Sequence, residues 1–408
     1  MAGQSTMRRR ALRRAGMPPG APRRRRWWPR RRWLQGLLVL ALGGALLVGS
    51  SLAQALMAPG TDSAAARLAE WARFHGLGWV VSDLEQAQYA LSPPAVGGTP
   101  TGGIPQVQPD GPATAAGPQR TAIPRPEAVR RLSAAPAPLT LQAQPPLPGE
   151  GRWQTLVQVH GDPAIRAAFL RPDSVHTSYV TGVAWLDQHL LRFSLHPGTQ
   201  VPGGTGWPVA PTVPRSARSA LIATFNSGFT MQDARGGYWQ GGQQVGTLRR
   251  GAAAMVFYRD GHLDVVKWGR DARLGPDVVA VRQNLDLLVD GGRLSPDLDS
   301  TTTSTWGKTL GNRAYVWRSA VGVRADGSVV VVVGASLSVR SLATLVRDAG
   351  AVRAMELDIN TSWTNFMTYT HPSPGTAVPH MLTSDERPRP DRYLYPSSRD
   401  FVSVVARP

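Results

Sequence analysis

Two acidic side chains, Glu356 and Asp358, stand two residues apart in a stretch that follows a predicted helix. Side chains alternate along a strand, so both carboxylates would lie on one face, about 7 Å apart at their Cα atoms. Carboxylates this close repel each other, and at least one should have a shifted pKa unless a cation or hydrogen-bond donors compensate. The alternative is an exposed strand end whose Asp caps a turn.

A third candidate is Arg318, on a strand predicted over residues 315–323. A guanidinium is well shaped to hold a phosphodiester through paired hydrogen bonds. Arg318 would share its strand face with Ala320 and Gly322, small residues that leave room above the sheet. The alternative is a buried salt bridge from Arg318 to Glu356 or Asp358, because buried arginines usually pair with acids. The two roles are compatible, since an empty site would show such a pair.

The elements that position these residues follow from apolar alternation and turn signals. Hairpins are expected over 180–195, joined near Asp187-Gln188, and over 252–268, around Asp260-Gly261. Ser336 or Ser338 can cap a helix that ends before Gly350. Strands are predicted at 153–159, 180–185, 190–195, 221–225, 252–258, 262–268, 284–289, 315–323, 328–333 and 352–358.

The order of strand, helix and strand over 328–358 predicts a right-handed crossover between parallel neighbours. The hairpin before it, turning at Asp326-Gly327, is antiparallel. We therefore predict an α/β fold of mixed α+β type, with a mixed sheet of antiparallel hairpins and one βαβ crossover. Ligands of open α/β sheets bind beyond the carboxyl ends of parallel strands, and residues 358–363 would lie at such an end.

Three motifs in this order resemble those of the phosphodiester glycosidase family. The resemblance covers roughly 153–370 and implies a domain, at 151–408, that cleaves a sugar from a sugar-1-phosphodiester. The motifs are Phe225-Asn226-Ser227-Gly228-Phe229, similar to Asn-Gly-Gly-Phe; Arg318-Ser319-Ala320-Val321-Gly322, similar to Arg-Thr-Ala-Ile-Gly; and Leu357-Asp358-Ile359-Asn360-Thr361-Ser362, in place of Leu-Asp-Gly-Gly-Gly-Ser.

The resemblance carries over to Asn226, Arg318 and Asp358. We assign Asp358 as nucleophile or base and Glu356 as its partner, because a carboxylate can stabilise the positive charge that develops on the sugar ring. Arg318 would hold the phosphate. Local turn bonds are the alternative for Asn360 and Ser362, and an interior position is the alternative for Trp363. The expected substrate-binding residues are Asn226, Gly228, Ser319, Asn360, Ser362 and Trp363.

The sequence departs from the family pattern where Ile359, Asn360 and Thr361 replace three glycines. A glycine turn lets backbone N–H groups approach a ligand closely, which branched residues hinder. This departure keeps a second interpretation open, in which a catalytically inactive domain of the same fold binds an envelope glycopolymer.

Cofactors are not indicated by the composition. The chain has no Cys, which excludes cysteine metal sites, and its eight His lack a zinc-binding spacing. An acidic region could hold a divalent cation such as calcium through oxygen ligands, although its spacing fits a solvated loop better. We predict no metal site and no cofactor, with calcium left open. The acidic region consists of Asp286, Asp290, Asp297 and Asp299.

The N-terminal region combines a basic tail with a long apolar run. Residues 1–32 hold twelve Arg and no acid, so +12 of the net charge of +18 belongs to the tail, and specific nucleic-acid binding is not expected. Residues 34–58 carry no charge over 25 positions, which is long enough to cross a bilayer. We predict a cytoplasmic tail at 1–33, a single-pass anchor at 34–58 and an extracytoplasmic C-terminal domain.

Two segments connect this run to the domain. The apolar spacing of residues 61–90 predicts juxtamembrane amphipathic helices, and Thr61 or Asp62 can cap the first of them. These helices would lie either on the outer membrane surface or on the domain. Residues 91–150 contain 14 Pro in 60 positions and predict a disordered, extended linker with a short helical patch at 126–132. The sequence gives no indication of the oligomeric state.

A cleaved signal sequence is the alternative to the anchor, because Ala53-Gln54-Ala55 has the small-x-small form of a cleavage site. The apolar run is longer than the roughly 7–15 residues of a signal peptide, so we expect the mature protein to retain it. N-terminal sequencing of the mature protein checks this expectation. A chain that begins at Leu56 would contradict the anchor and indicate secretion.

Overall fold

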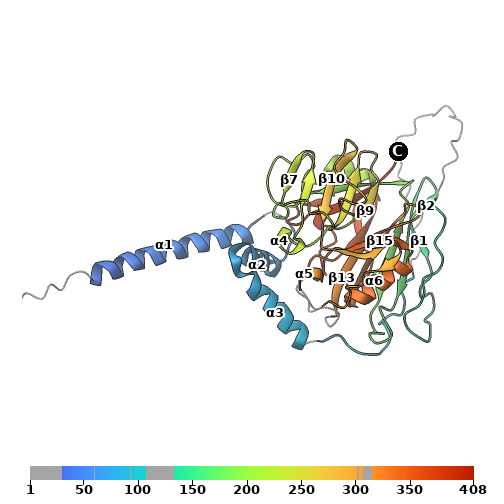
Figure 1. Ribbon diagram of the computed structural model, residues 1–408, viewed down its shortest axis with the longest axis horizontal. Helices are drawn as coiled ribbons and strands as arrows, with labels where there is room; N and C mark the ends of the chain where they lie inside the picture. Colours follow the sequence, from blue (N-terminus) through green and yellow to red (C-terminus); the bar gives the residue numbers. More distant parts are fainter. Residues whose placement is uncertain (1–29, 59, 92, 107–132, 301–302, 307–314) are drawn as a thin grey trace, which may run out of the picture. The chain divides into compact units, whose positions relative to one another are not determined.

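The computed structural model describes residues 30–58, 60–91, 93–106, 133–300, 303–306 and 315–408. The chain divides into two units, residues 1–54 and 55–408. Helix α1 (Arg30–Leu56), whose residues 30–54 are the described part of the first unit, carries the 24-residue apolar run Trp33–Leu56 (Figure 1). By length and composition it can cross a membrane, as predicted, although a signal sequence near the N-terminus has the same features.

The second unit consists mainly of three antiparallel sheets. Their strand orders are β1-β2-β3-β14-β13-β15-β11-β12, β7-β6-β10-β8-β9 and β17-β16-β5-β18-β4. The bounds are β1 (Gln154–Val159), β2 (Asp162–Leu170), β3 (Thr181–Leu186), β4 (Leu191–His196), β5 (Leu221–Asn226), β6 (Tyr238–Gln240), β7 (Gln243–Val245), β8 (Ala253–Tyr258), β9 (Leu263–Lys267), β10 (Val278–Gln283), β11 (Leu287–Asp290), β12 (Arg293–Leu294), β13 (Val316–Arg324), β14 (Val329–Leu337), β15 (Ala351–Glu356), β16 (Phe366–Thr370), β17 (Val378–Met381) and β18 (Phe401–Ala406).

Helices of the second unit are few and mostly short. Beyond α2 and α3, which follow the apolar run, the longest is α6, on the first sheet. The bounds are α2 (Ala64–Ala72), the π-helix η1 (Arg73–Leu77), α3 (Gly78–Leu91), the 3-10 helix η2 (Arg215–Ala220), α4 (Met231–Ala234), α5 (Thr303–Trp306), α6 (Val339–Asp348) and the 3-10 helix η4 (Arg392–Leu394).

The predicted mixed sheet is wrong, because the strands pair antiparallel in all three sheets of the described chain. Strands β14 and β15 are joined through α6, but β13 lies between them and pairs with both. The turn at Asp326-Gly327 places β13 beside β14 before the helix begins, so the parallel neighbours of a βαβ unit do not form. Residues 358–363 therefore do not lie at the carboxyl ends of two neighbouring parallel strands.

The two predicted hairpins have different outcomes. The hairpin of β8 and β9 around Asp260-Gly261 is confirmed. Strands β3 and β4 lie where they were expected, but β3 pairs with β2 and β14 while β4 pairs with β18. The chain passes there from one sheet to another, so that Leu186 and Phe193 both reach the core between the layers. Pairing them would have placed both strands in one layer.

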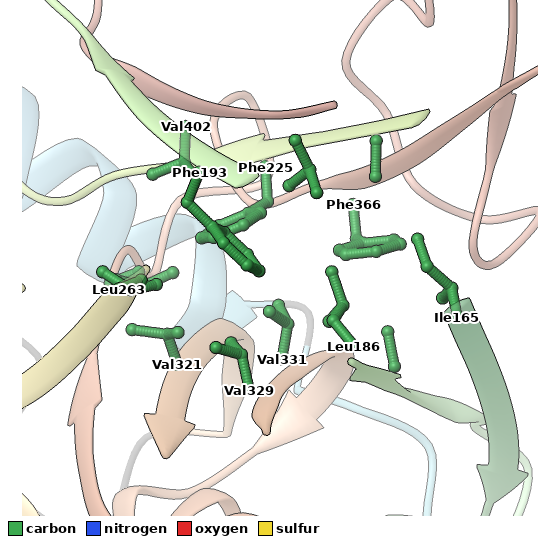
Figure 2. Packing of buried hydrophobic residues seen from close by; sticks show 14 of the residues in the cluster. Ile165, Leu186, Phe193, Phe225, Leu263, Val321, Val329, Val331, Phe366 and Val402 are labelled. Carbon is green, nitrogen blue, oxygen red and sulfur yellow. The ribbon is translucent and has the colours of Figure 1, made fainter. Parts of the chain in front are cut away.

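The main core lies between the first sheet and the third, and strands of the second sheet also contribute to it. Figure 2 shows Val321, Val329 and Val331 of β13 and β14 on one side, facing Phe225 and Phe366 on the other. All five are fully buried. Strand β14 contains a continuous run of valines and is buried on both faces. Such a run is expected in a strand that is covered on both sides, because neither face contacts water.

Helix α6 covers the opposite face of the first sheet, beside β13 and β15 (Figure 1). Ser338 caps it, as predicted: its Oγ accepts a hydrogen bond from the Ser341 N–H at 3.0 Å, and the Ser341 Oγ accepts one from the Ser338 N–H at 2.8 Å. Leu342 packs in one cluster with Ala320 and Ala354. The space above these small residues, where a ligand was expected, is therefore filled by the helix.

Helix α2 packs on the sheet domain. Its N-cap is Ser63, whose Oγ accepts a hydrogen bond from the Ala66 N–H at 3.1 Å, so neither Thr61 nor Asp62 is the cap. Asp62 instead binds the Arg392 guanidinium at 3.0 Å, and Glu70 is buried. Of the two positions left open by the sequence, α2 occupies the one on the domain.

Parts of the predicted linker also lie on the domain. Ile104 and Leu139 are buried in the two large apolar clusters, and the Ser133 N–H donates to the Asp187 carboxylate at 2.9 Å. Residues 93–106 and 133–150 therefore differ from an extended spacer, because apolar side chains between the prolines find partners on the sheets. The helical patch expected at 126–132 lies outside the described residues.

Leu342→Ala should destabilise the domain by about 2–5 kcal/mol, because it removes fully buried apolar volume between α6 and the first sheet. Urea denaturation measures this loss. The matched control is Leu274→Ala at an exposed position, which should stay within about 0.5 kcal/mol of the wild type. Equal stability of the two variants would contradict the packing of α6.

Candidate active site

Arg318 and Glu356 form a buried ion pair on the α6 side of the first sheet. The Nη1 of Arg318 lies 2.5 Å from Glu356 Oε1, and its Nε donates to the Leu337 carbonyl at 2.8 Å. Both side chains are 0% exposed. Burial raises the pKa of Glu356, and Arg318 opposes that rise. The salt bridge given above as the alternative role of Arg318 is therefore present in the structure, and its partner is Glu356.

Asp358 is buried in a turn directly after β15, with 2% of its surface exposed. Its Oδ1 accepts hydrogen bonds from the N–H groups of Ile359 at 2.7 Å and Asn360 at 3.0 Å. Burial raises the pKa of Asp358 to about 6, against the opposing effects of the Arg399 charge and of these two N–H groups. A carboxyl group with this pKa can change its protonation state near neutral pH.

Asn226 and Ser319 tie the Asp358 turn to two sheets. The Ser319 N–H donates to the Asp358 carbonyl at 2.9 Å, which continues the β13–β15 pairing past the end of β15. Asn226, at the end of β5, donates from Nδ2 to Ser319 Oγ at 3.0 Å and accepts from the Asn365 N–H at 3.1 Å. Asn226 and Ser319 thus lie beside the Asp358 turn, with their side chains bonded within the protein.

The turn itself uses Asn360 and Ser362 for local bonds. Asn360 Oδ1 accepts from the Ser362 N–H at 2.8 Å, and the Ser362 carbonyl accepts from Arg392 Nη1 at 2.7 Å. Trp363 is 3% exposed and lies 4.8 Å, from ring centroid to guanidinium carbon, from both Arg392 and Arg399. The alternatives for these three residues, turn bonds and an interior position, match this geometry.

Arg399 was not identified from the sequence. Of the charged groups that act on Asp358, it lowers the pKa of that carboxyl most. It is buried, and its Nη2 donates to Glu70 of α2 at 3.0 Å, while Nε and Nη1 have no hydrogen-bond partner among the described residues. The charges of Glu70, Asp358 and Asp400 raise its pKa, against the effect of burial. The only sequence signal was an Arg-Asp pair before an apolar strand, which is too common to indicate a site.

A second buried ion pair lies beside the first motif. Arg282 binds Asp400, and Ser227 Oγ donates to the same carboxylate oxygen of Asp400 at 3.2 Å. A side chain at Gly228 would begin 3.2 Å from Arg282 Nη2, so Gly228 allows the guanidinium to approach the backbone. Gly228 therefore has a packing role, and Ser227 contributes a hydroxyl where the family pattern has a glycine.

Unpaired polar atoms concentrate in this region of the domain. Such atoms are rare in proteins, because burial without a partner costs roughly 1–3 kcal/mol each. Among the described residues, those without a hydrogen-bond partner include Glu356 Oε2, Asn284 Oδ1, Asn365 Oδ1, Asp400 Oδ1 and two nitrogens of Arg399. The region is therefore suited to a polar ligand.

Two cavities open beside α2 and η1. One, of about 570 Å³, is lined by Arg73 together with Trp317, Asn360 and Trp363. The other, of about 460 Å³, is lined by Arg73, Phe74, Trp79 and Asp233. Both are large enough for a sugar phosphate and carry an arginine and aromatic side chains at their walls.

The acidic region is engaged in ion pairs. Asp290 binds Arg270 at 2.7 Å, and Asp299 binds Arg340. Within the described ranges, no three His, Cys, Asp or Glu side chains converge in a way that could hold a metal ion.

Comparison with known proteins supports the resemblance drawn from the three motifs. Residues 219–383 match the model of the phosphodiester glycosidase family, and all three motifs lie within that range. No curated protein matches the chain.

Two solved structures are similar at 14% identity. A hypothetical protein from Synechocystis has a TM-score of 0.35, with 62% of this chain and 64% of that chain covered. A protein from Burkholderia pseudomallei has a TM-score of 0.27, with 56% and 74% covered. Neither likeness is close enough to carry an argument about function.

Asp358→Asn should raise the stability of the protein at pH 8 more than at pH 4.5. The folded pKa of about 6 exceeds the unfolded value of about 3.9, so the folded state binds more protons between these values and loses stability as the pH rises through them. Asn does not ionise in this pH range, so the variant does not lose stability as the pH rises. Urea denaturation of both proteins at the two pH values measures the difference, and a gap that does not change with pH would contradict the buried carboxyl.

Proposed function

We propose that residues 151–408 form an extracytoplasmic glycosidase domain that hydrolyses the sugar–phosphate bond of a sugar-1-phosphodiester. The observation that carries this proposal is the buried carboxyl of Asp358, which lies inside the family-matched segment 219–383 and whose pKa is raised to about 6. The charge of Arg399, which follows that segment and has two unpaired nitrogens among the described residues, acts on this carboxyl. Helix α1 would anchor the domain to the membrane, which points to cell-envelope glycans as substrates.

Asp358 acts as the nucleophile or general base in this proposal. Cleavage of the C1–O bond develops positive charge on the sugar ring, and a carboxylate on that side can stabilise the charge, attack the ring or activate water. The phosphate is already a good leaving group, so a strong general acid is less necessary. The nearby Arg399 favours the charged carboxylate that this role needs.

Arg399 replaces Arg318 as the group that we assign to the phosphate. The guanidinium of Arg318 is taken up by Glu356 and by the Leu337 carbonyl, whereas two nitrogens of Arg399 have no partner among the described residues. Arg318 and Glu356 become positioning residues. Breaking a buried pair of this kind costs about 3–5 kcal/mol, so the pair fixes β13 against β15, and with them Ser319 and Asp358.

A catalytically inactive domain that binds an envelope glycopolymer is the second candidate. The observation that favours it is the deep burial of Asp358 beneath a turn that carries branched Ile359 and Thr361. Such a domain would use the two cavities beside α2 for binding alone.

One assay separates the two candidates. The full-length protein in detergent micelles is given the methyl ester of a sugar-1-phosphate, and release of reducing sugar is followed. We expect turnover that Asp358→Asn lowers about 10²–10⁴-fold or more, and a kcat/KM that rises as the pH passes about 6. Arg399→Gln should mainly raise KM.

Asp385→Asn is the matched control, because Asp385 is an exposed acid on the same domain and should leave turnover unchanged. Binding of the diester without release of sugar would indicate the glycopolymer-binding domain. Full turnover in Asp358→Asn would remove this residue from the mechanism.

A further inference from the structure

Large apolar side chains are exposed along η1 and α3. Phe74 is 53% exposed and Trp79 62%, and Leu77 and Leu84 are exposed as well. We call these four residues the juxtamembrane apolar surface. They fall within eleven positions of the chain, and monomeric soluble proteins rarely gather apolar groups at the surface without a partner.

The domain covers these side chains only in part, because Phe74 and Trp79 border a cavity against it and both stay more than half exposed. Helix α2, which precedes this surface, packs on the domain through its buried residues Ala66 and Glu70. Glu70 accepts a hydrogen bond from Arg399 at 3.0 Å. Gly76 has φ +78, a conformation that glycine adopts readily, and it lies in the kink that turns the chain from α2 into α3. The exposed groups therefore follow a helix that is already fixed on the domain.

The chain itself indicates what covers the surface. The apolar run of α1 ends at Leu56, and only the seven residues 57–63 separate it from α2. Seven extended residues span at most about 25 Å. The start of α2 therefore stays within that distance of the end of the apolar run, and Phe74 and Trp79 follow it by ten and fifteen residues. Aromatic side chains favour the membrane interface.

The charge of this segment favours an apolar contact over an electrostatic one. Residues 74–91 contain no Lys or Arg, and their acids are Asp83 and Glu85. The basic residue next to them, Arg73, binds Glu70 at 3.2 Å. Binding to anionic headgroups would require basic residues near the surface. Neutral lipid is therefore the matching partner.

We propose that the juxtamembrane apolar surface lies in the lipid interface of the membrane that α1 spans. This inference rests on the membrane anchoring proposed above. It places the mouth of the 460 Å³ cavity, whose wall includes Phe74, Trp79 and Arg73, at the level of the lipid headgroups.

The absence of Cys from the sequence makes a direct test simple. Single variants Phe74→Cys, Trp79→Cys and Leu84→Cys of the full-length protein carry a spin label in vesicles of neutral phosphatidylcholine. We expect a severalfold higher ratio of oxygen to nickel-chelate accessibility at these positions than at Leu274→Cys, an exposed apolar position on the sheet domain. Ratios equal to that of Leu274→Cys would overturn the proposal.

Two further measurements separate the possible failures. A label at Leu42→Cys, within α1, reports whether the span itself lies in lipid. If Leu42→Cys is exposed to water, the anchoring proposal fails; if it lies in lipid and Trp79→Cys does not, only the present inference fails. Labels shielded from both reagents, with spin–spin broadening between chains, would show that a second copy covers the surface and would also overturn it.

Discussion

The carboxyl group of Asp358 lies in the interior, where an ionised group costs several kcal/mol unless charges and hydrogen bonds compensate. Two N–H groups of its own turn and the guanidinium of Arg399 provide that compensation only in part, since burial still raises the pKa to about 6. The protein therefore tolerates a group that would be more stable as a neutral one. Such a compromise is common where a group is kept for its chemistry.

Three distant segments surround the turn that carries this carboxyl. β13 supplies Ser319, whose backbone pairs with Asp358 beyond the end of β15. β5 contributes Asn226 from the third sheet, and β18 is preceded by Arg399, which is joined to α2 through Glu70. The site thus depends on the contact of two sheets and one helix, which explains why segments far apart in the sequence are needed to build it.

Local patterns in the sequence were sufficient for ten of the strands and for part of the site, but not for β2, β10, β16 or β18. The valine run of β14, the Ser338 cap and the Asp260-Gly261 turn act over a few residues, so their signals are complete within the sequence. The motifs around Asn226, Ser319 and Asp358 could be recognised for the same reason, and the structure brings these residues together. The apolar run of α1 could also be predicted from the sequence, because its length and hydropathy depend on the sequence alone.

Tertiary structure decided which strands became neighbours and which charges met. The sequence could not show that β13 would lie between β14 and β15, because hydrogen bonding between strands carries no residue-specific signal at long range. For the same reason it left Arg318 with two possible roles, a ligand contact or a salt bridge, of which the structure shows the bridge to Glu356. It missed Arg399, whose charge comes to act on Asp358 only through the packing of β18 and α2. The local sequence determines periodicity and helix caps, because these involve residues only a few positions apart. The partners of a buried charge are determined by the packing of distant segments.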